Sequence, residues 1–489
     1  MSIETPTLVT FIVYLVGMLA IGLIAYKMTS NLSDYVLGGR RLGGSVAALS
    51  AGASDMSSWL LLGLPGAMYV GGMSQIWIGI GLAIGAYLNW QFVASRLRRY
   101  TEVANDSITV PDYLENRFRD GSKAIRVISA IVILVFFTFY TSSGLVGGAI
   151  LFESSFGMSY ESALWIGALV IISYTFLGGF LAVSWTDFFQ GILMFLALVV
   201  VPIVALNEVG GWNETVNLAG QADTKHLDIF TGMSFISILS LLGWGLGYFG
   251  QPHIITRFMA VKSSKEIPKA RLVGMTWMVI SLFGAIFTGF IGIAYFSAGG
   301  PLDNPETIFI EFTQVLFNPW VSGFLLAAIL SAIMSTIDSQ LLVSSSAVAE
   351  DFYKAILRKN ASQTELVWVG RIAVLAIALI AILLAYNPDS SVLNLVSYAW
   401  AGFGAAFGPV IILSLFWKRM TRNGALAGII TGAVVVILWS QLSGGLFDLY
   451  ELIPGFILAW IAVMAFSFVG KEPGAEIEAE FEEARVSKL

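Results

Sequence analysis

The chain has 489 residues, 57% of them hydrophobic and 12% charged, with a mean hydropathy of +0.81 and a formal net charge of −6. This composition excludes an ordinary soluble domain, and recurring apolar runs near 20 residues predict several helices that each cross roughly 30 Å of hydrocarbon. The runs lack the two-residue alternation of a membrane barrel, so the expected class is an all-α polytopic membrane protein. With no cysteine and only two histidines, disulfides and thiolate metal sites are excluded and a histidine metal site is disfavoured.

Thirteen transmembrane helices are predicted in chain order. We expect residues 1–470 to form a single transmembrane domain and residues 471–489 to form an acidic cytoplasmic tail that is solvated and partly disordered. The predicted spans cover residues 6–26, 43–72, 74–95, 125–150, 160–180, 186–206, 231–252, 273–297, 319–345, 368–386, 393–416, 423–441 and 450–469.

The basic residues test this number of spans. Every Lys and Arg except Lys225 falls in a segment that thirteen spans place on one side of the membrane. An error of one span would scatter these charges over both sides. The positive-inside rule then places the N-terminus in the periplasm or outside the cell and the C-terminus in the cytoplasm.

The second span contains an unusual charge. Asp55 is the only charged residue between Leu42 and Ser95, and residues 50–59 around it are small, polar and glycine-containing. A carboxylate at the centre of a membrane helix costs about 2.5–3.5 kcal/mol on insertion scales. A cation, a water-filled cavity or a polar partner must offset this cost. The alternative is a purely structural carboxylate that binds backbone amides at a helix break.

A second interrupted span lies five spans later. Residues 243–253 contain four glycines and Pro252, which weaken a continuous helix. Interruptions at matching places in successive five-helix blocks are typical of an inverted-repeat transporter, and unwound carbonyls at such breaks suit Na⁺. Spans 2–6 (residues 43–206) form the first predicted repeat and spans 7–11 (residues 231–416) the second. One N-terminal and two C-terminal helices lie outside the repeats.

The ninth span contributes a third polar group of residues. The hydroxyls of Ser335 and Thr336, with the carbonyl of Ala332 one turn earlier, form an oxygen cluster that suits a hard monovalent cation. The alternative is that these hydroxyls bond only to carbonyls of their own helix. Asp338 is a second intramembrane carboxylate, and both a pathway role and a structural role remain open for it.

Five segments carry a resemblance to a known family. They are ALSAGASDMS (48–57), GGFLAVSWTD (178–187), WGLGYFGQP (244–252), SYAWAGFGAAFGP (397–409) and TRNGALAG (421–428). Together they resemble the sodium/solute symporter family over about residues 5–470. The resemblance implies a fold of the LeuT type, with substrate and Na⁺ bound near the middle of the membrane.

The resemblance also implies roles for individual residues. Asp55 is expected to shape the Na⁺ site or to act close to it. The implied sodium-binding residues are Ala53, Asp55, Met56, Ala332, Ser335 and Thr336. The implied substrate-binding residues are Ser57, Trp59, Tyr140, Trp244, Tyr248 and Pro252. The residues implied in gating or coupling are Arg40, Asp187 and Asp338.

Structural explanations compete with several of these roles. Trp244 and Tyr248 lie four residues apart on one helical face, and aromatic residues of membrane bundles commonly pack in the core. Tyr140 could likewise pack or bond to a neighbouring helix. Asp187 could cap the sixth helix, because a carboxylate near a helix N-terminus is favourable.

The expected function is Na⁺-coupled uptake of L-proline by alternating access in a bacterial inner membrane. The expected partners are L-proline, Na⁺ as the coupling ion, and the lipid bilayer. We expect no other cofactor, no nucleic acid and no obligate protein partner. A family symporter for another amino acid, pantothenate or a sugar is the nearest alternative, and a transporter-like sensor is a more distant one. The chain is not expected to be an enzyme, because it lacks the H-E-x-x-H and G-x-S-x-G motifs and a cysteine nucleophile.

Overall fold

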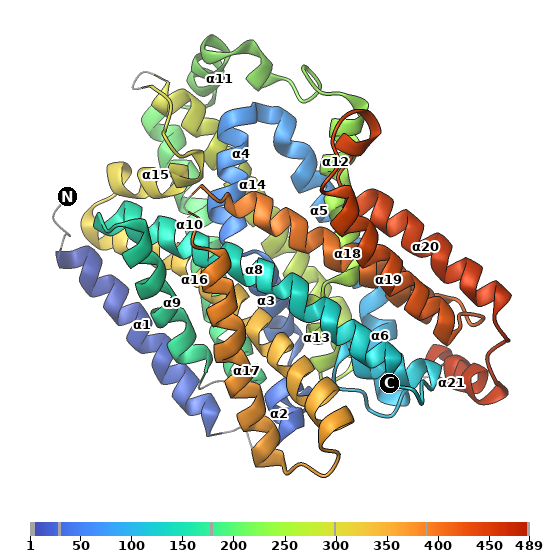
Figure 1. The fold of residues 1–489 in the computed structure, drawn as a ribbon. Helices are drawn as coiled ribbons and strands as arrows, with labels where there is room; N and C mark the ends of the chain where they lie inside the picture. Colours follow the sequence, from blue (N-terminus) through green and yellow to red (C-terminus); the bar gives the residue numbers. More distant parts are fainter. Residues whose placement is uncertain (1–4, 28–30, 177–178, 298–299, 388, 487–489) are drawn as a thin grey trace.

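A computed structural model describes residues 5–27, 31–176, 179–297, 300–387 and 389–486 as a bundle of helices (Figure 1). Gly178 of the second motif and the last three residues of the tail lie outside these ranges. The α-helices are α1 (Thr5–Tyr26), α2 (Leu32–Leu37), α3 (Gly44–Asp55), α4 (Leu64–Gly71), α5 (Ile76–Leu88), α6 (Ala94–Val103), α7 (Val110–Phe118), α8 (Ala124–Phe156), α9 (Tyr160–Thr175), α10 (Phe180–Val209), α11 (Trp212–Ala222), α12 (Phe235–Gly243), α13 (Pro252–Ala260), α14 (Ile267–Phe296), α15 (Ile308–Leu316), α16 (Pro319–Ser346), α17 (Gln363–Leu384), α18 (Val392–Phe416), α19 (Arg422–Trp439), α20 (Leu452–Val469) and α21 (Ala475–Val486).

Ten helices in the described ranges are long and apolar enough to cross a membrane, and the apolar helices Tyr160–Ser173 and Phe235–Gly250 are shorter. The number is lower than the thirteen predicted spans for two physical reasons. One candidate, Trp59–Val103, joins two predicted spans, although the chain turns at Gly72 (φ +65°) and α4 and α5 run in opposite directions (Figure 1). The broken seventh span and the fifth span, which contains the helix Tyr160–Ser173, are also too short to satisfy the length criterion.

Both predicted interruptions are present. Helix α3 ends at Asp55, and Met56 has non-helical dihedrals (φ −83°, ψ 75°). A π-helical segment, η2 (Trp59–Gly63), then leads into α4. In the seventh span, the 3-10 segment η6 (Trp244–Gly250) separates α12 from α13, and Pro252 is the first residue of α13. Proline suits this position because the first turn of a helix does not use its N–H groups for intrahelical bonds.

Helices α16 and α18 form the centre of the bundle. They are buried along most of their length, with α8 packed against both. Helix α1 covers α16 on one side, while α19 and α20 cover α18 on the other (Figure 1). Helix α5 meets η6 through glycines, since a Cβ on Gly85 would lie 2.1 Å from the carbonyl oxygen of Gly245. The two broken helices therefore lie inside the bundle, where irregular backbone is tolerated at membrane depth.

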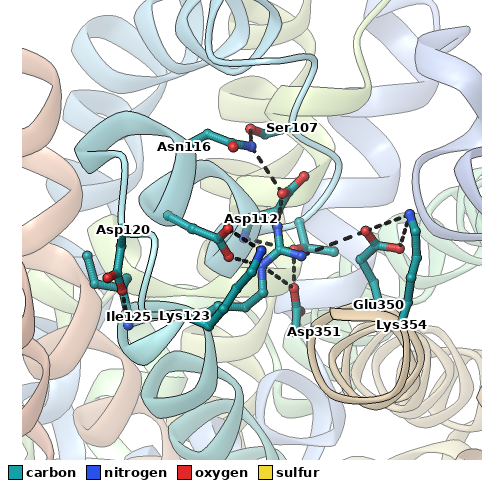
Figure 2. A network of polar contacts seen from close by, with 12 residues as sticks. Ser107, Asp112, Asn116, Asp120, Lys123, Ile125, Glu350, Asp351 and Lys354 are labelled. Carbon is teal, nitrogen blue, oxygen red and sulfur yellow. Dashed lines mark hydrogen bonds and ion pairs between the residues drawn. The ribbon is translucent and has the colours of Figure 1, made fainter. Parts of the chain in front are cut away.

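A cluster of charged residues joins α7 and α8 to the π-helical end of α16, η9 (Ala347–Leu357). Arg126 is its centre and is 7% exposed. The carboxylates around it, which we call the Arg126 cluster with it, are Asp112, Glu115, Glu350 and Asp351. Figure 2 shows Lys123 and Lys354 at its margins, bonded to Glu115 and Glu350 respectively.

The tail differs from the solvated, partly disordered extension that its acidic composition predicts. Residues 475–486 form helix α21, which packs against α6. Phe481 is 5% exposed, with its ring centroid 6.1 Å from that of Tyr100, and Glu480 pairs with Arg119 at 3.1 Å. The prediction of partial disorder is wrong for residues 475–486, because the buried ring of Phe481 docks the helix, whereas the acidic side chains of the helix are half-buried or exposed.

Candidate functional site

The break after α3 directs one carbonyl group toward aromatic and polar side chains. The carbonyl oxygen of Asp55 accepts hydrogen bonds from the Ser57 amide (3.0 Å), the Trp59 indole N–H (3.0 Å) and the Tyr140 hydroxyl (3.3 Å). Ser57 also caps the turn, since its Oγ accepts a bond from the Trp59 amide at 3.3 Å. The interruption therefore joins three of the predicted substrate residues.

Two residues before Asp55, in the last turn of α3, another carbonyl faces the hydroxyls of α16. The Ala53 oxygen accepts hydrogen bonds from Ser335 Oγ at 2.7 Å and from Thr336 Oγ1 at 3.3 Å. Ser335 Oγ also lies 3.2 Å from the Ala332 carbonyl oxygen, so bonding within its own helix accompanies the contact with α3. Met56, also buried, follows at the helix end. The structure thus brings together Ala53, Ala332 and the hydroxyl pair as neutral oxygen donors of the kind that suits Na⁺.

The side chain of Asp55 takes a different direction from the Ala53 carbonyl. It is 3% exposed, and its Oδ2 accepts a hydrogen bond from the Tyr248 hydroxyl at 2.5 Å. This bond links the broken ends of α3 and η6, the two interrupted spans. A charge-assisted bond of this kind offsets part of the cost of burying the carboxylate. The contact with Tyr248 agrees with a carboxylate that organises the site beside the oxygen cluster.

The four aromatic residues among the predicted substrate residues, Trp59, Tyr140, Trp244 and Tyr248, are buried, with none more than 6% exposed. The rings of Trp59 and Trp244 have centroids 6.4 Å apart, while Tyr248 lies edge-on to Trp400 at 5.0 Å. Trp244 also stacks on Tyr450 at 5.5 Å. The core-packing alternative is therefore correct as a description of Trp244 and Tyr248, and a substrate role for them stays a prediction.

Two aromatic members of this group escaped the sequence reasoning. Trp400 donates its indole N–H to the Trp244 carbonyl at 2.8 Å, and Tyr450 donates its hydroxyl to the Ser397 carbonyl at 2.6 Å. Trp400 lies inside the motif 397–409, so that motif held a usable signal. Tyr450 lies just before α20 in a predicted helix outside the repeats, and nothing in its local sequence distinguishes it.

Asp187 lies in a buried cluster that joins four helices. It is the eighth residue of α10, which begins at Phe180, so the helix-capping alternative is wrong. Its Oδ2 accepts bonds from Ser50 (2.7 Å) and Ser54 (3.0 Å) of α3, and pairs with Arg257 of α13 at 3.2 Å. Arg257 also donates to Ser339 of α16 at 2.6 Å. We call these five residues the Asp187 cluster.

Arg257 is the functional candidate that sequence reasoning missed. It was interpreted only as one of the basic residues that define the cytoplasmic side, yet neither its side chain nor that of Asp187 is exposed. It also donates to Ser50 Oγ (3.1 Å) and to the His253 carbonyl (2.9 Å), and its guanidinium carbon lies 5.1 Å from the ring of Phe180. The only feature of the sequence that could have indicated a buried position for Arg257 is its place five residues after Pro252, close to the interrupted seventh span.

The other two predicted gating residues lie apart from each other. Asp338 is fully buried on α16, and its Oδ1 accepts a bond from Ser339 at 3.3 Å, which connects it to the Asp187 cluster. Arg40 pairs with Asp106 at 2.8 Å and donates to the carbonyl oxygens of Ser107 and Met259, both at 2.7 Å. Arg40 thus ties the α6–α7 connection to the end of α13 and makes no contact in the oxygen cluster among the described residues.

An all-α membrane bundle in which one broken helix meets a buried oxygen cluster and bonds to a second broken helix through Asp55 and Tyr248 has the architecture of a polytopic membrane transporter. Residues 35–432 match the profile of the Sodium:solute symporter family. The chain belongs to this family, which is one of transporters and not of enzymes.

Three known proteins show how far the similarity extends. A sodium/proline symporter of Salmonella typhimurium is 58% identical, covering 99% of this chain and 97% of that protein. The high-affinity proline transporter PutP of Bacillus subtilis is 57% identical, covering 95% and 98% respectively. The fold is that of a Na⁺-coupled sialic acid symporter solved in a substrate-bound outward-open state. That structure superposes with a TM-score of 0.81 at 21% identity and covers 97% of this chain and all of the other.

Proposed function

We propose that this chain is a Na⁺-coupled symporter for L-proline that works by alternating access in a bacterial inner membrane. The observation that carries the proposal is the meeting of the Ala53 carbonyl with Ser335 and Thr336, at 2.7 and 3.3 Å. The substrate is supported by the names of the relatives, which are proline transporters at 57–58% identity over nearly the whole chain. Na⁺ is the coupling ion, and the transporter needs no other cofactor.

The membrane topology is part of the proposal. The chain crosses the membrane thirteen times, with residues 43–206 and 231–416 as inverted repeats of a LeuT-type fold within a domain of residues 1–470. The two broken spans, α3–α4 and α12–α13, occupy corresponding places in these repeats. The N-terminus lies in the periplasm, and residues 471–489 lie in the cytoplasm, as the distribution of Lys and Arg predicts.

The Na⁺ site is assigned to the contact between α3 and α16. The ion would bind the carbonyls of Ala53, Met56 and Ala332 and the hydroxyls of Ser335 and Thr336, releasing the Ala53 carbonyl from its hydroxyl partners. Because these groups belong to two helices, an ion between them stabilises one relative position of α3 and α16. Asp55 holds the break of α3 against Tyr248 and supplies negative charge close to the ion.

The substrate site is assigned to the aromatic group above the break. Proline offers a compact apolar ring, which suits Trp59, Trp244, Tyr140 and Tyr248, and Pro252 fixes the start of α13 beneath them. The carboxylate of the substrate would accept bonds near Ser57, at the start of the second half-helix, where the partial positive charge of a helix N-terminus favours an anion. Na⁺ and substrate therefore share the same broken helix, which couples their binding.

Opening toward the cytoplasm is assigned to the Asp187 cluster. The Asp187–Arg257 pair and Ser339 join α3 and α13 to α10 and α16, so separating these helices requires the pair to break or rearrange. Asp338 influences this contact through Ser339. Arg40 acts further out, where it holds α13 to the α6–α7 connection.

Uptake into proteoliposomes tests the function. Radiolabelled proline should accumulate only with an inward Na⁺ gradient, and Ser335→Ala should raise the Na⁺ concentration for half-maximal uptake by about 10-fold, the effect of losing roughly 1.4 kcal/mol of binding. Ser331→Ala is the matched control, because Ser331 lies one turn before Ser335 on α16 and its hydroxyl donates to the Ala327 carbonyl at 2.8 Å, away from the Ala53 carbonyl. Accumulation that ignores the Na⁺ gradient contradicts Na⁺ coupling. Uptake that is blocked by another amino acid, pantothenate or a sugar, and not by proline, contradicts the substrate.

A further inference from the structure

A small cavity lies on the side of α3 that faces α5, η6 and α14. Asp55, Asn89, Tyr248, Gly274 and Met278 are among the residues that line it. The space open to the centre of a water molecule is ≈ 20 Å³. About 10–15 Å³ by this measure suffices for one water molecule. The cavity is therefore of the right size for a single small occupant.

Two buried oxygen atoms on the walls of this cavity lack a hydrogen-bond partner. Within the described parts of the chain, no donor reaches Asp55 Oδ1 or Asn89 Oδ1, and the two side chains are 3% and 1% exposed. A buried polar atom without a partner costs about 1–3 kcal/mol, more when it is charged. Two such atoms in one cavity point to an occupant that donates to both.

The neighbouring contacts fix which atom of Asn89 is free. Its Nδ2 donates to the Tyr248 carbonyl at 2.9 Å, which leaves Oδ1 as the acceptor. The Tyr248 hydroxyl in turn donates to the other carboxylate oxygen of Asp55 at 2.5 Å. Asn89 is also the first residue of a π-helical segment, η4 (Asn89–Val93), and such segments occur frequently at functional sites. Asn89 and Asp55 are therefore already joined through Tyr248 on one side.

We propose that one buried water molecule occupies this cavity and donates to Asp55 Oδ1 and Asn89 Oδ1, which makes Asn89 a positioning residue for Asp55. Water matches the site because it has two protons to donate and finds two acceptors. Two side-chain oxygens are too few for a hard cation, which takes about six oxygen ligands. The proposal rests on the proposed function, since Asp55 is the carboxylate next to the assigned Na⁺ site.

The water completes the set of contacts that hold the break of α3. Tyr248 holds one carboxylate oxygen and the water holds the other, so the Asp55 side chain is fixed from two directions. A fixed carboxylate keeps the Ala53 carbonyl, two residues earlier, oriented toward Ser335. Loss of the water should therefore weaken Na⁺ binding more than it slows the transport cycle at saturating Na⁺.

Gly274→Ala is the sharpest variant, because it fills the cavity and leaves both polar side chains intact. A Cβ at Gly274 has as its nearest neighbours Ala48 Cβ and Trp90 Nε1, both at 3.6 Å. These are ordinary contact distances between residues that line the cavity, so the methyl group fits and takes the place of the water. We expect the Na⁺ concentration for half-maximal proline uptake to rise about 10-fold, corresponding to one lost bond to a charged group. Maximal uptake at saturating Na⁺ should stay within about twofold of wild type.

Two substitutions of Asn89 separate a water-mediated role from simple packing. Asn89→Leu removes both polar atoms of the side chain and fills their space with larger methyl groups, whereas Asn89→Ala removes the same atoms and leaves room for a second water molecule that restores a partner to Asp55. If the water positions Asp55, the Leu variant should need more Na⁺ than the Ala variant. Packing alone predicts the reverse order, because truncation to Ala creates the larger cavity. Met278→Leu is the control, since it changes an apolar wall at similar volume.

The outcomes distinguish this inference from the proposed function. If wild type shows Na⁺-driven uptake but Gly274→Ala and Asn89→Leu keep the Na⁺ requirement within about twofold, the water proposal is overturned and the function stands. A high-resolution map should show a peak at about 2.8 Å from both oxygens, which Gly274→Ala removes. An anomalous peak in the cavity after soaking with Tl⁺, a heavy monovalent cation, would identify a cation and overturn the proposal.

Discussion

The Asp187 cluster and the Arg126 cluster each place an arginine among carboxylates inside the bundle, but they are built differently. Arg257 has a single carboxylate partner, Asp187, and the rest of its donors meet hydroxyls and a carbonyl. Arg126 has four carboxylates within 4 Å and lies beside two lysines at the margin of the cluster (Figure 2). The charge of Arg257 therefore depends on one carboxylate. The charge of Arg126 can still be compensated when one of its four carboxylates is lost.

Burial explains the difference in construction. Neither partner of the Asp187–Arg257 pair is exposed, so each charge must find its compensation in the other and in the surrounding dipoles. The Arg126 cluster is reached by solvent at Asp112, which is 13% exposed, and at Lys354, which is 37% exposed. An arrangement with one pair suits the opening contact that we propose for the Asp187 cluster, whereas many carboxylates around one arginine suit a permanent joint.

The largest expected effect comes from breaking the single pair. Arg257→Gln leaves the Asp187 carboxylate buried without its cation, and removal of one partner of a buried pair costs about 3–5 kcal/mol. Na⁺-driven proline uptake should fall to the background level and the thermal unfolding temperature should drop. Arg271→Gln, a change of the same type on α14, should leave both nearly unchanged. The double variant Asp187→Asn with Arg257→Gln should recover stability without recovering uptake. Uptake above half of wild type in Arg257→Gln would remove the pair from the transport mechanism.

An intermediate effect is expected at the other cluster. Arg126→Gln leaves four carboxylates without their shared cation, but Lys123 and Lys354 remain and solvent is near, so the cost should be about 2 kcal/mol. Thermal unfolding should move to lower temperature, and the Na⁺ concentration for half-maximal uptake should stay within about twofold. Added choline chloride should restore part of the lost stability, because salt screens repulsion between carboxylates near solvent. A strong rise in the Na⁺ requirement would mean that this cluster, too, takes part in ion coupling.

The smallest effect is expected when a single carboxylate of the Arg126 cluster is removed. Glu350→Gln leaves Arg126 with three carboxylates and removes the ion pair with Lys354, whose Nζ lies 3.0 Å from both Glu350 oxygens. The change in unfolding free energy should be below about 1 kcal/mol, and proline uptake should match wild type. Measuring the unfolding free energies of Glu350→Gln and Arg126→Gln side by side tests whether the remaining carboxylates can replace the lost one. Equal destabilisation by the two variants would show that the carboxylates do not substitute for one another.

The loop beside the Arg126 cluster illustrates how local contacts set charge near the membrane surface. Burial raises the pKa of the Asp120 carboxyl, but hydrogen bonds from Ser122, the Ile125 amide and Arg422 outweigh it and hold the pKa below its ordinary value. Asp120 therefore stays ionised and keeps α19 joined to the start of α8.

Much of the fold was predictable from local sequence. Apolar runs of membrane length and the small, polar stretch around Asp55 need only their immediate neighbours to be recognised, and the helix ends at Asp55 and Pro252 lie where glycine, serine and proline weaken the helix. The adjacent hydroxyls of Ser335 and Thr336 on α16 were also recognisable from their immediate neighbours in the sequence. Of the two apolar helices that are too short for the span criterion, Phe235–Gly250 is the one broken by these residues.

The tertiary structure alone decided which of these groups meet. Ser335 and the Ala53 carbonyl are 282 residues apart, and no local pattern encodes their contact. Arg257 looked like one more basic residue at a helix end, and only packing of α3, α10, α13 and α16 around it made it a buried partner of Asp187. The docking of Phe481 on Tyr100 and the bond from Asn89 to the Tyr248 carbonyl have the same origin. The sequence determined which residues could bear charge or break a helix in a membrane. Long-range packing decided which of these residues share a site, because the contacts join helices that are distant in the chain.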